Sequence, residues 1–111
     1  MSKNISFKDY DSWLTENIYK PQHDYLLQVL GICGEAGEIA EKMKKIVRDK
    51  EGKISEEDRK EILKEAGDVL WYISRLAQSL NSSIEEVAQI NMEKVKSRKD
   101  RGAIQGEGDN R

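Results

Sequence analysis

The sequence predicts an all-α fold: a four-helix bundle built around an antiparallel central helix hairpin and completed by oligomerisation. Apolar residues recur at the helical period through most of the chain, and polar capping pairs precede these segments. Charged residues make up 36% and hydrophobic residues 37% of the 111 residues, a balance typical of helical proteins with wide solvated faces. A chain of this length has a modest core of its own, so further copies are expected to complete its burial.

Composition also limits the class of protein. The net charge of −2 gives no reason to expect nucleic acid or an anionic membrane as a partner. The single cysteine, Cys33, excludes an intramolecular disulfide and suits a reducing compartment. The N-terminal residues lack a signal-peptide apolar region, and no apolar run reaches membrane-spanning length. We therefore expect one cytoplasmic domain over residues 1–111.

The first two helices are expected over residues 6–17 and about 24–47. Ser6 with Asp9 forms a capping-box pattern at the start of the first, and Pro21 lies in the connecting segment that follows it. The second helix carries one apolar stripe at a period near 3.6 residues. Its members are Val29, Ile32, Ala36, Ile39, Met43 and Ile46.

Two further helices follow a turn around Gly52. Ser55 with Asp58 is a second capping-box pattern, and the third helix is expected to run to about Leu80. Ser83, with Glu86 three residues later, opens the fourth helix. Residues 102–111 form a Gly-rich tail without periodicity.

A repeated pentapeptide is the strongest functional signal. Residues 35–39 and 65–69 both read acid, small residue, Gly, acid, β-branched residue. The acids of both copies flank their helix's apolar stripe, and both copies lie at similar distances from the turn. Helices joined by a short turn pack antiparallel, so the two copies should meet at one height. The carboxylates predicted to converge are Glu35, Glu38, Glu65 and Asp68.

Converging carboxylates beside apolar surface repel one another unless a cation is bound. All-oxygen ligation suits Mg²⁺, Mn²⁺ or Ca²⁺ and not zinc, which prefers Cys and His. The chemistry that follows is metal-assisted attack of water on a phosphoryl group, with one carboxylate as general base. The simpler alternative is that each acidic pair is solvated surface charge.

A Gly-Glu-x-x-Glu helix followed by a Glu-x-x-Asp helix resembles the all-α nucleoside triphosphate pyrophosphohydrolase superfamily, specifically its small MazG-like phage and bacterial members. The resemblance covers about residues 22–111, and residues 1–21 contribute little to it. Matching segments include Glu65-Ala-Gly-Asp-Val-Leu-Trp-Tyr, Asn91-Met-Glu-Lys-Val-Lys-Ser-Arg and the ending Gly108-Asp-Asn-Arg111.

The resemblance implies Mg²⁺-dependent hydrolysis of (d)NTPs to the monophosphate and pyrophosphate, with Mn²⁺ as an alternative ion. The same four carboxylates would be the metal ligands and catalytic residues. It also implies a homodimer or homotetramer with the nucleotide near a subunit interface, and a house-cleaning role towards nucleotide pools. Larger MazG proteins carry a second acid before the first motif, whereas this chain has Gly34, as smaller dimeric relatives do.

Further residues are expected around the nucleotide. Lys42 lies one turn beyond Glu38, where it contacts phosphate or pairs with an acid. By resemblance, Tyr72 lies beside the sugar or base, and His23 precedes the second helix in a nucleotide-contacting loop. For Tyr72 the alternative is a core-edge position, and for His23 an exposed loop position.

The fourth helix offers three more candidates. Asn91 falls within its apolar stripe, so it is expected to be buried and hydrogen-bonded. Lys94 and Arg98 lie at the edge of that stripe, where they would hold the triphosphate or form a solvated basic helix end. Trp71, opposite the apolar stripe of the third helix, is expected at an oligomer interface, with base stacking as the second reading.

The same residues are compatible with other functions. A pyrophosphatase specialised for dUTP or dCTP would keep the metal ligands and differ only in its base contacts. A non-catalytic Mg²⁺- or nucleotide-binding helical module would bind without turnover. A structural oligomerisation protein would bind neither.

Overall fold

The computed structural model describes residues 4–17 and 25–102, and over these residues all of the regular secondary structure is α-helix. The helices are α1 (Phe7–Asn17), α2 (Tyr25–Lys50), α3 (Glu56–Ser79) and α4 (Ile84–Asp100). These bounds confirm the predicted all-α class and the order of the four helices. None of the described helices is both long enough and apolar enough to cross a membrane.

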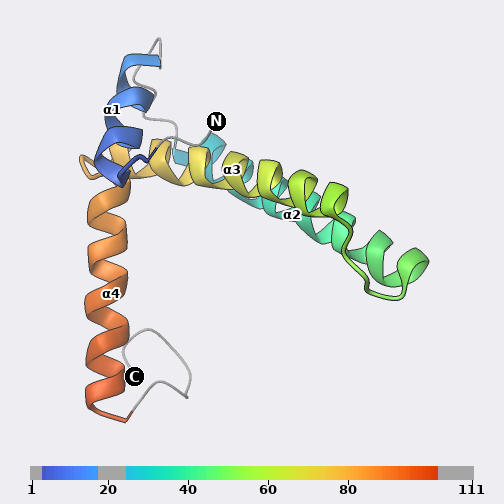
Figure 1. The fold of residues 1–111 in the computed structure, drawn as a ribbon. Helices are drawn as coiled ribbons and strands as arrows, with labels where there is room; N and C mark the ends of the chain where they lie inside the picture. The colour runs from blue at the N-terminus through green and yellow to red at the C-terminus, as the bar shows by residue number, and fades with distance from the viewer. Residues whose placement is uncertain (1–3, 18–24, 103–111) are drawn as a thin grey trace.

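Helices α2 and α3 form the predicted antiparallel hairpin and lie side by side along their lengths (Figure 1). The turn between them needs left-handed backbone at Glu51 (φ 55°) and Gly52 (φ 76°). Glycine adopts this conformation without steric cost. The Gly52 N–H donates to the Ile46 carbonyl at 3.1 Å, which closes the last turn of α2.

The predicted helix starts are confirmed. Ser55 and Asp58 form a complete capping box at α3, in which each side chain accepts from the other's backbone N–H at 3.1 Å. Ser6 and Asp9 form the same reciprocal pair at α1. At α4 the Ser83 side chain accepts from the Glu86 N–H, as an N-cap does.

Helices α1 and α4 meet at the end of the hairpin away from its turn, and α4 points away from the hairpin (Figure 1). Over the described residues α4 contacts α1 and α3 and makes no contact with α2. The radius of gyration is 16.8 Å, compared with about 13 Å for a compact domain of 100 residues. One chain alone therefore leaves the four helices as an open arrangement.

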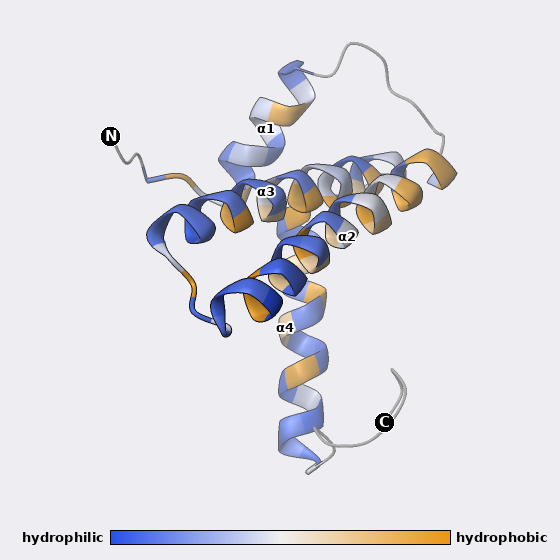
Figure 2. Cartoon of the chain, turned by 90° about the vertical axis from the view of Figure 1, so that its right-hand side faces the viewer, coloured by the Kyte–Doolittle hydropathy of each residue, from blue (hydrophilic) through white to orange (hydrophobic). Residues whose placement is uncertain are grey.

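This openness leaves much apolar surface uncovered. The buried apolar side chains among the described residues are Leu14, Ile46, Ala77 and Ile84. Val29, a predicted stripe member of α2, is instead exposed, and so are Leu80 and Val95, because no helix of the same chain covers them. Figure 2 shows the resulting hydrophobic stretches at the start of α2 and along α4. Apolar side chains that are at least 40% exposed there include Leu26, Leu27, Leu30, Ile90 and Met92.

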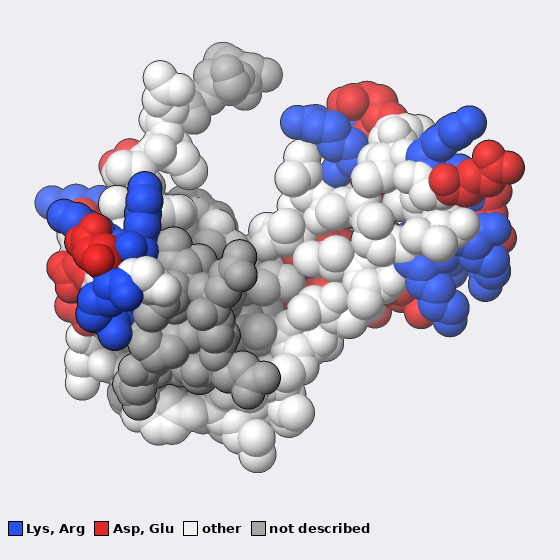
Figure 3. All heavy atoms as spheres, turned by 90° about the horizontal axis from the view of Figure 1, so that it is seen from below, with Lys and Arg blue, Asp and Glu red and all other residues white. Residues whose placement is uncertain are grey.

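On the face that Figure 3 shows, charged side chains gather at two places. Lys and Arg lie with Asp and Glu at the hairpin turn and at the far end of α4. At the turn the two signs pair: Lys50 Nζ lies 2.8 Å from Asp58, and Arg48 Nε lies 2.8 Å from Asp49. Mixed charges of this kind are typical of solvated helix ends. A binding surface for a charged partner would carry mainly charges of the opposite sign.

Candidate metal and nucleotide site

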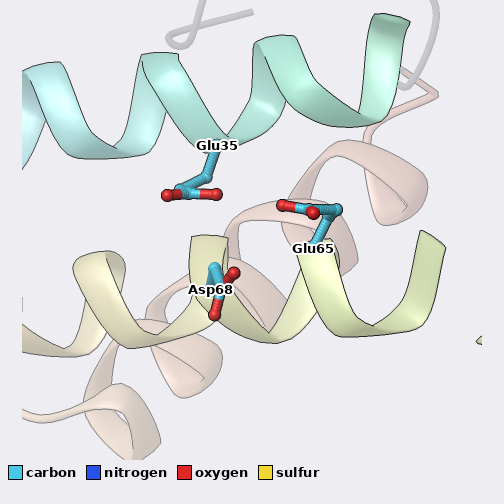
Figure 4. A group of neighbouring side chains, drawn as sticks. All are labelled: Glu35, Glu65 and Asp68. Carbon is cyan, nitrogen blue, oxygen red and sulfur yellow. The ribbon is translucent and has the colours of Figure 1, made fainter. Parts of the chain in front are cut away.

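The two copies of the pentapeptide meet across the hairpin. Glu35 extends from α2 towards α3, where Glu65 and Asp68 lie one turn apart (Figure 4). One carboxylate oxygen from each of the three lies within 4.8 Å of the others. Glu35 and Glu65 are half-buried and Asp68 is exposed, so the cluster opens to solvent on one side. The predicted matching height of the two motifs is thus found in the structure.

Glu35 has the least favourable electrostatic position in this cluster. Its pKa is raised above the ordinary carboxyl value, first by desolvation and then by a hydrogen bond shared with the Glu65 carboxyl. The negative charges of Asp68, Glu65 and Glu38 raise this pKa further. Without a cation, the site therefore resists carrying its full negative charge. A divalent cation held by oxygen ligands would relieve this repulsion, so the donor set fits a hard cation such as Mg²⁺, Mn²⁺ or Ca²⁺.

Glu38 stays outside the three-residue cluster. It is exposed and lies one helical turn after Glu35 on α2, so its charge reaches Glu35 without its oxygens joining the other three. Its predicted role as a ligand remains a prediction.

Lys42 pairs across the hairpin and not along its own helix. Its Nζ lies 4.0 Å from Oε1 of Glu65, and both side chains are partly exposed. The sequence suggested an acid four residues earlier as the alternative partner; the helix packing supplies Glu65 instead. Lys42 therefore places a positive charge at the edge of the cluster.

The three candidates on α4 are not brought to the cluster within one chain. Asn91 is exposed, so the prediction that it is buried was wrong: the face of α4 that carries it has no neighbouring helix here. Lys94 is half-buried and Arg98 is buried, on a helix that does not contact α2 over the described residues. His23 lies outside the described residues.

Helix α1 contributes more than its sequence suggested. The pKa of Tyr10 is raised by burial, then by the negative charge of Asp68 and of Asp11. This places the Tyr10 side chain within electrostatic reach of the carboxylate cluster. Nothing in the spacing of residues 1–21 connects them to a motif almost sixty residues later, since only helix packing brings α1 there.

Tyr72 lies against α2. A Cβ added at Gly31 would overlap with the Tyr72 ring, so the glycine lets the ring rest on the helix backbone. This agrees with the core-edge alternative for Tyr72. Trp71 is half-buried instead of exposed, because its ring meets Tyr72 edge-on at 5.0 Å between centroids and Arg75 covers its face. The expected place of Trp71 at an oligomer interface remains a prediction.

Comparison with known proteins decides the family. The model of the MazG nucleotide pyrophosphohydrolase domain matches residues 23–102. The chain belongs to the MazG family. Nucleotide pyrophosphohydrolase activity is the general function of this family, and its members usually use a divalent metal. All three clustered carboxylates lie inside the MazG match, whereas α1 lies before it.

A curated relative supports the assignment. The MazG chain is 55% identical over 82 residues to the Gene 37 protein of Mycobacterium phage L5. The aligned segment covers 74% of this chain and 72% of the relative. The relative's name states no activity. No solved structure gives a significant match.

Proposed function

We propose that this MazG protein hydrolyses nucleoside triphosphates to the monophosphate and pyrophosphate, using Mg²⁺ held by Glu35, Glu65 and Asp68 with Glu38 beside them. The observation that supports this most directly is the group of three carboxylate oxygens within 4.8 Å of one another, drawn from two helices. The family match adds the class of reaction.

Each residue has a part in the proposed reaction. Bound Mg²⁺ would supply the positive charge that neutralises the phosphates and acidifies an attacking water. A carboxylate of the group that is not occupied as a ligand accepts the proton of that water. The water oxygen bonds to the α-phosphorus as the bond to the bridging oxygen breaks, and pyrophosphate leaves. Lys42, whose Nζ lies 4.0 Å from Glu65 at the edge of the cluster, would contact the phosphates.

We further propose that a second copy completes the site, as a homodimer or homotetramer. The exposed apolar residues at the start of α2 and on α4 support this, because apolar surface left open by one chain is stabilised by covering it. Association that covers α4 would also give Asn91, Lys94 and Arg98 a route to the nucleotide of a neighbouring copy. A cytoplasmic house-cleaning role towards nucleotide pools fits such an enzyme.

The direct test is pyrophosphate release across canonical and modified (d)NTPs with Mg²⁺. Glu35→Gln and Asp68→Asn should each abolish turnover, while circular dichroism shows an unchanged helical content. Glu41→Gln is the matched control, since Glu41 is an exposed α2 acid paired with Lys44 at 3.8 Å, outside the cluster. Glu38→Gln tests the fourth predicted ligand.

Two results would contradict the proposal. One is the absence of release with every substrate together with no Mg²⁺ binding by calorimetry. The other is full activity in both cluster variants, which would mean that the site is assigned to the wrong residues.

A further inference from the structure

Arg75 on α3 is a half-buried cation that forms no ion pair within the described part of the chain. Among the described residues no carboxylate pairs with it, and its Nε is buried without a hydrogen-bond partner. The guanidinium lies over the Trp71 ring, with Cζ 4.6 Å from the ring centroid. Taking an arginine partly out of water without a counter-charge costs free energy. Such an arrangement points to a ligand that accepts its hydrogen bonds.

Packing holds this guanidinium in place. Gly31 allows the Tyr72 ring to rest on α2, Tyr72 meets Trp71 edge-on at 5.0 Å, and Trp71 supports Arg75. From the hairpin interface outwards, Tyr72 therefore holds the Trp71 ring, and the Trp71 ring holds the Arg75 guanidinium. With Nε buried, the terminal N–H groups of Arg75 are the donors that remain to meet a ligand. A guanidinium group held in this way loses little side-chain entropy when it binds a ligand.

Arg75 also lies at a suitable distance from the carboxylates. It follows Asp68 by seven residues, which is two helical turns, so both side chains leave α3 on nearly the same flank. The separation along the axis is about 10 Å, at 1.5 Å per residue. A nucleotide with its phosphates at the carboxylate cluster would extend its base over this distance.

We propose that Arg75 determines base specificity by donating two parallel hydrogen bonds to a base edge that carries two adjacent acceptors. This inference rests on the proposed function for the position of the phosphates. Guanine offers such an edge at O6 and N7, and cytosine at O2 and N3. Adenine sets an amino donor beside N7, and thymine and uracil set an N–H between their carbonyls. The favoured substrates are therefore guanine or cytosine nucleotides.

The experiment measures kcat/KM for dGTP, dCTP, dATP and dTTP with Mg²⁺. The intact protein should favour dGTP, dCTP or both over dATP and dTTP by about tenfold or more, the discrimination of one good bidentate pair. Arg75→Ala should reduce this preference to within about threefold, because the paired donors are gone. Arg75→Lys keeps the charge and the stem over Trp71 but loses the planar fork, so it should lose the preference as well.

Arg59→Lys is the matched control. Arg59 is exposed near the start of α3 and pairs with Glu56 at 3.4 Å, so its replacement should leave the base preference unchanged. Thermal unfolding of each variant shows whether α3 remains folded. If Arg75→Ala does not fold, the Arg75→Lys measurement decides the outcome.

Three results would overturn the inference: no base preference in the intact protein, a preference that survives in Arg75→Lys, or an equal loss with all four substrates in Arg75→Ala. The last would assign Arg75 to the phosphates. If no substrate is hydrolysed, calorimetric binding of the four dNTPs with Ca²⁺ separates the two proposals. A dGTP or dCTP preference in binding that depends on Arg75 then supports the inference without the enzyme, and equal binding of all four rejects it.

Discussion

Asp11 caps the helix that begins at Ile84. Its Oδ1 accepts a hydrogen bond from the Ile84 N–H at 3.0 Å, and its Oδ2 one from the Glu85 N–H at 3.3 Å. The Asp11 backbone carbonyl also accepts from the Gln78 side chain at 3.2 Å. A residue of α1 thus satisfies backbone donors at the start of α4 and fixes the junction of three helices.

Asp11→Ala should therefore destabilise the protein by about 1 kcal/mol, the typical effect of losing a helix cap. This corresponds to a fall in melting temperature of about 4–8 °C in a small domain. Glu16→Ala, an exposed acid on the same helix, is the control and should change the melting temperature little. Equal melting temperatures for Asp11→Ala and the intact protein would show that α1 does not anchor α4.

Gly31→Ala should destabilise the hairpin, although alanine is the better helix former by up to about 1 kcal/mol. The added methyl group would overlap with the Tyr72 ring, and crowding of this kind costs about 1–3 kcal/mol. Gly37→Ala is the matched control on the same helix, because its Cβ would meet no atom within 4 Å. Chemical denaturation should show opposite signs for the two variants, and stabilisation by Gly31→Ala would refute the close approach.

Removing the metal should make stability depend on Glu35. Its pKa is higher in the folded protein than in the unfolded chain, so the folded state disfavours the charged carboxylate. The contribution of Glu35 to the stability of the folded state is therefore fully present below the unfolded pKa of 4.5. It is lost as pH rises through the higher pKa of the folded state. In EDTA, Glu35→Gln should abolish this loss of stability with rising pH. Mg²⁺ should also raise the melting temperature of Glu35→Gln less than it raises that of the intact protein.

A thermal melt series from pH 4 to 8, with EDTA and then with Mg²⁺, makes this measurement. Glu41→Gln is again the control, because it lies on α2 outside the cluster. The same Mg²⁺ gain in Glu35→Gln as in the intact protein would remove Glu35 from the set of ligands.

The hairpin turn should lose stability only in strong acid. The hydrogen bonds from Lys50 and from Ser55 lower the pKa of Asp58 from 3.8 to about 2. Because the folded pKa is depressed, this stabilisation is present above pH 3.8 and is lost as pH falls through about 2. Asp58→Asn should remove that part of the pH dependence, measured by unfolding between pH 1.5 and 5. Glu57→Gln, a neighbouring exposed acid, should keep it.

The helices and the carboxylate site could be predicted because both depend on local spacing. The Ser55–Asp58 pair marks the start of α3 by chemistry within one turn, and Gly52 marks a turn position whose left-handed backbone favours glycine. Glu35 and Glu65 could be matched because a short turn leaves antiparallel packing as the solution for two amphipathic helices. For these features the sequence and the helix period were sufficient.

Contacts between segments far apart in the chain could not be predicted in this way. Asp11 caps α4 across 73 residues, and Tyr10 comes under the charge of Asp68, yet neither spacing follows a local rule. Asn91 was expected in a core because it lies in an apolar stripe. An apolar stripe shows that burial of that helix face is favourable, but it does not show which element buries it. In one chain that face of α4 is open.

The four helices, their caps and the meeting of two acidic motifs can be read from the residues alone, since they follow from local hydrogen bonding and the helical period. The folded arrangement adds that Glu38 stays outside the cluster, that Lys42 pairs with Glu65, and that Arg75 lies over the Trp71 ring. Those outcomes depend on side-chain contacts and on how the helices pack against one another. The helical periodicity of the amino-acid sequence does not specify these contacts.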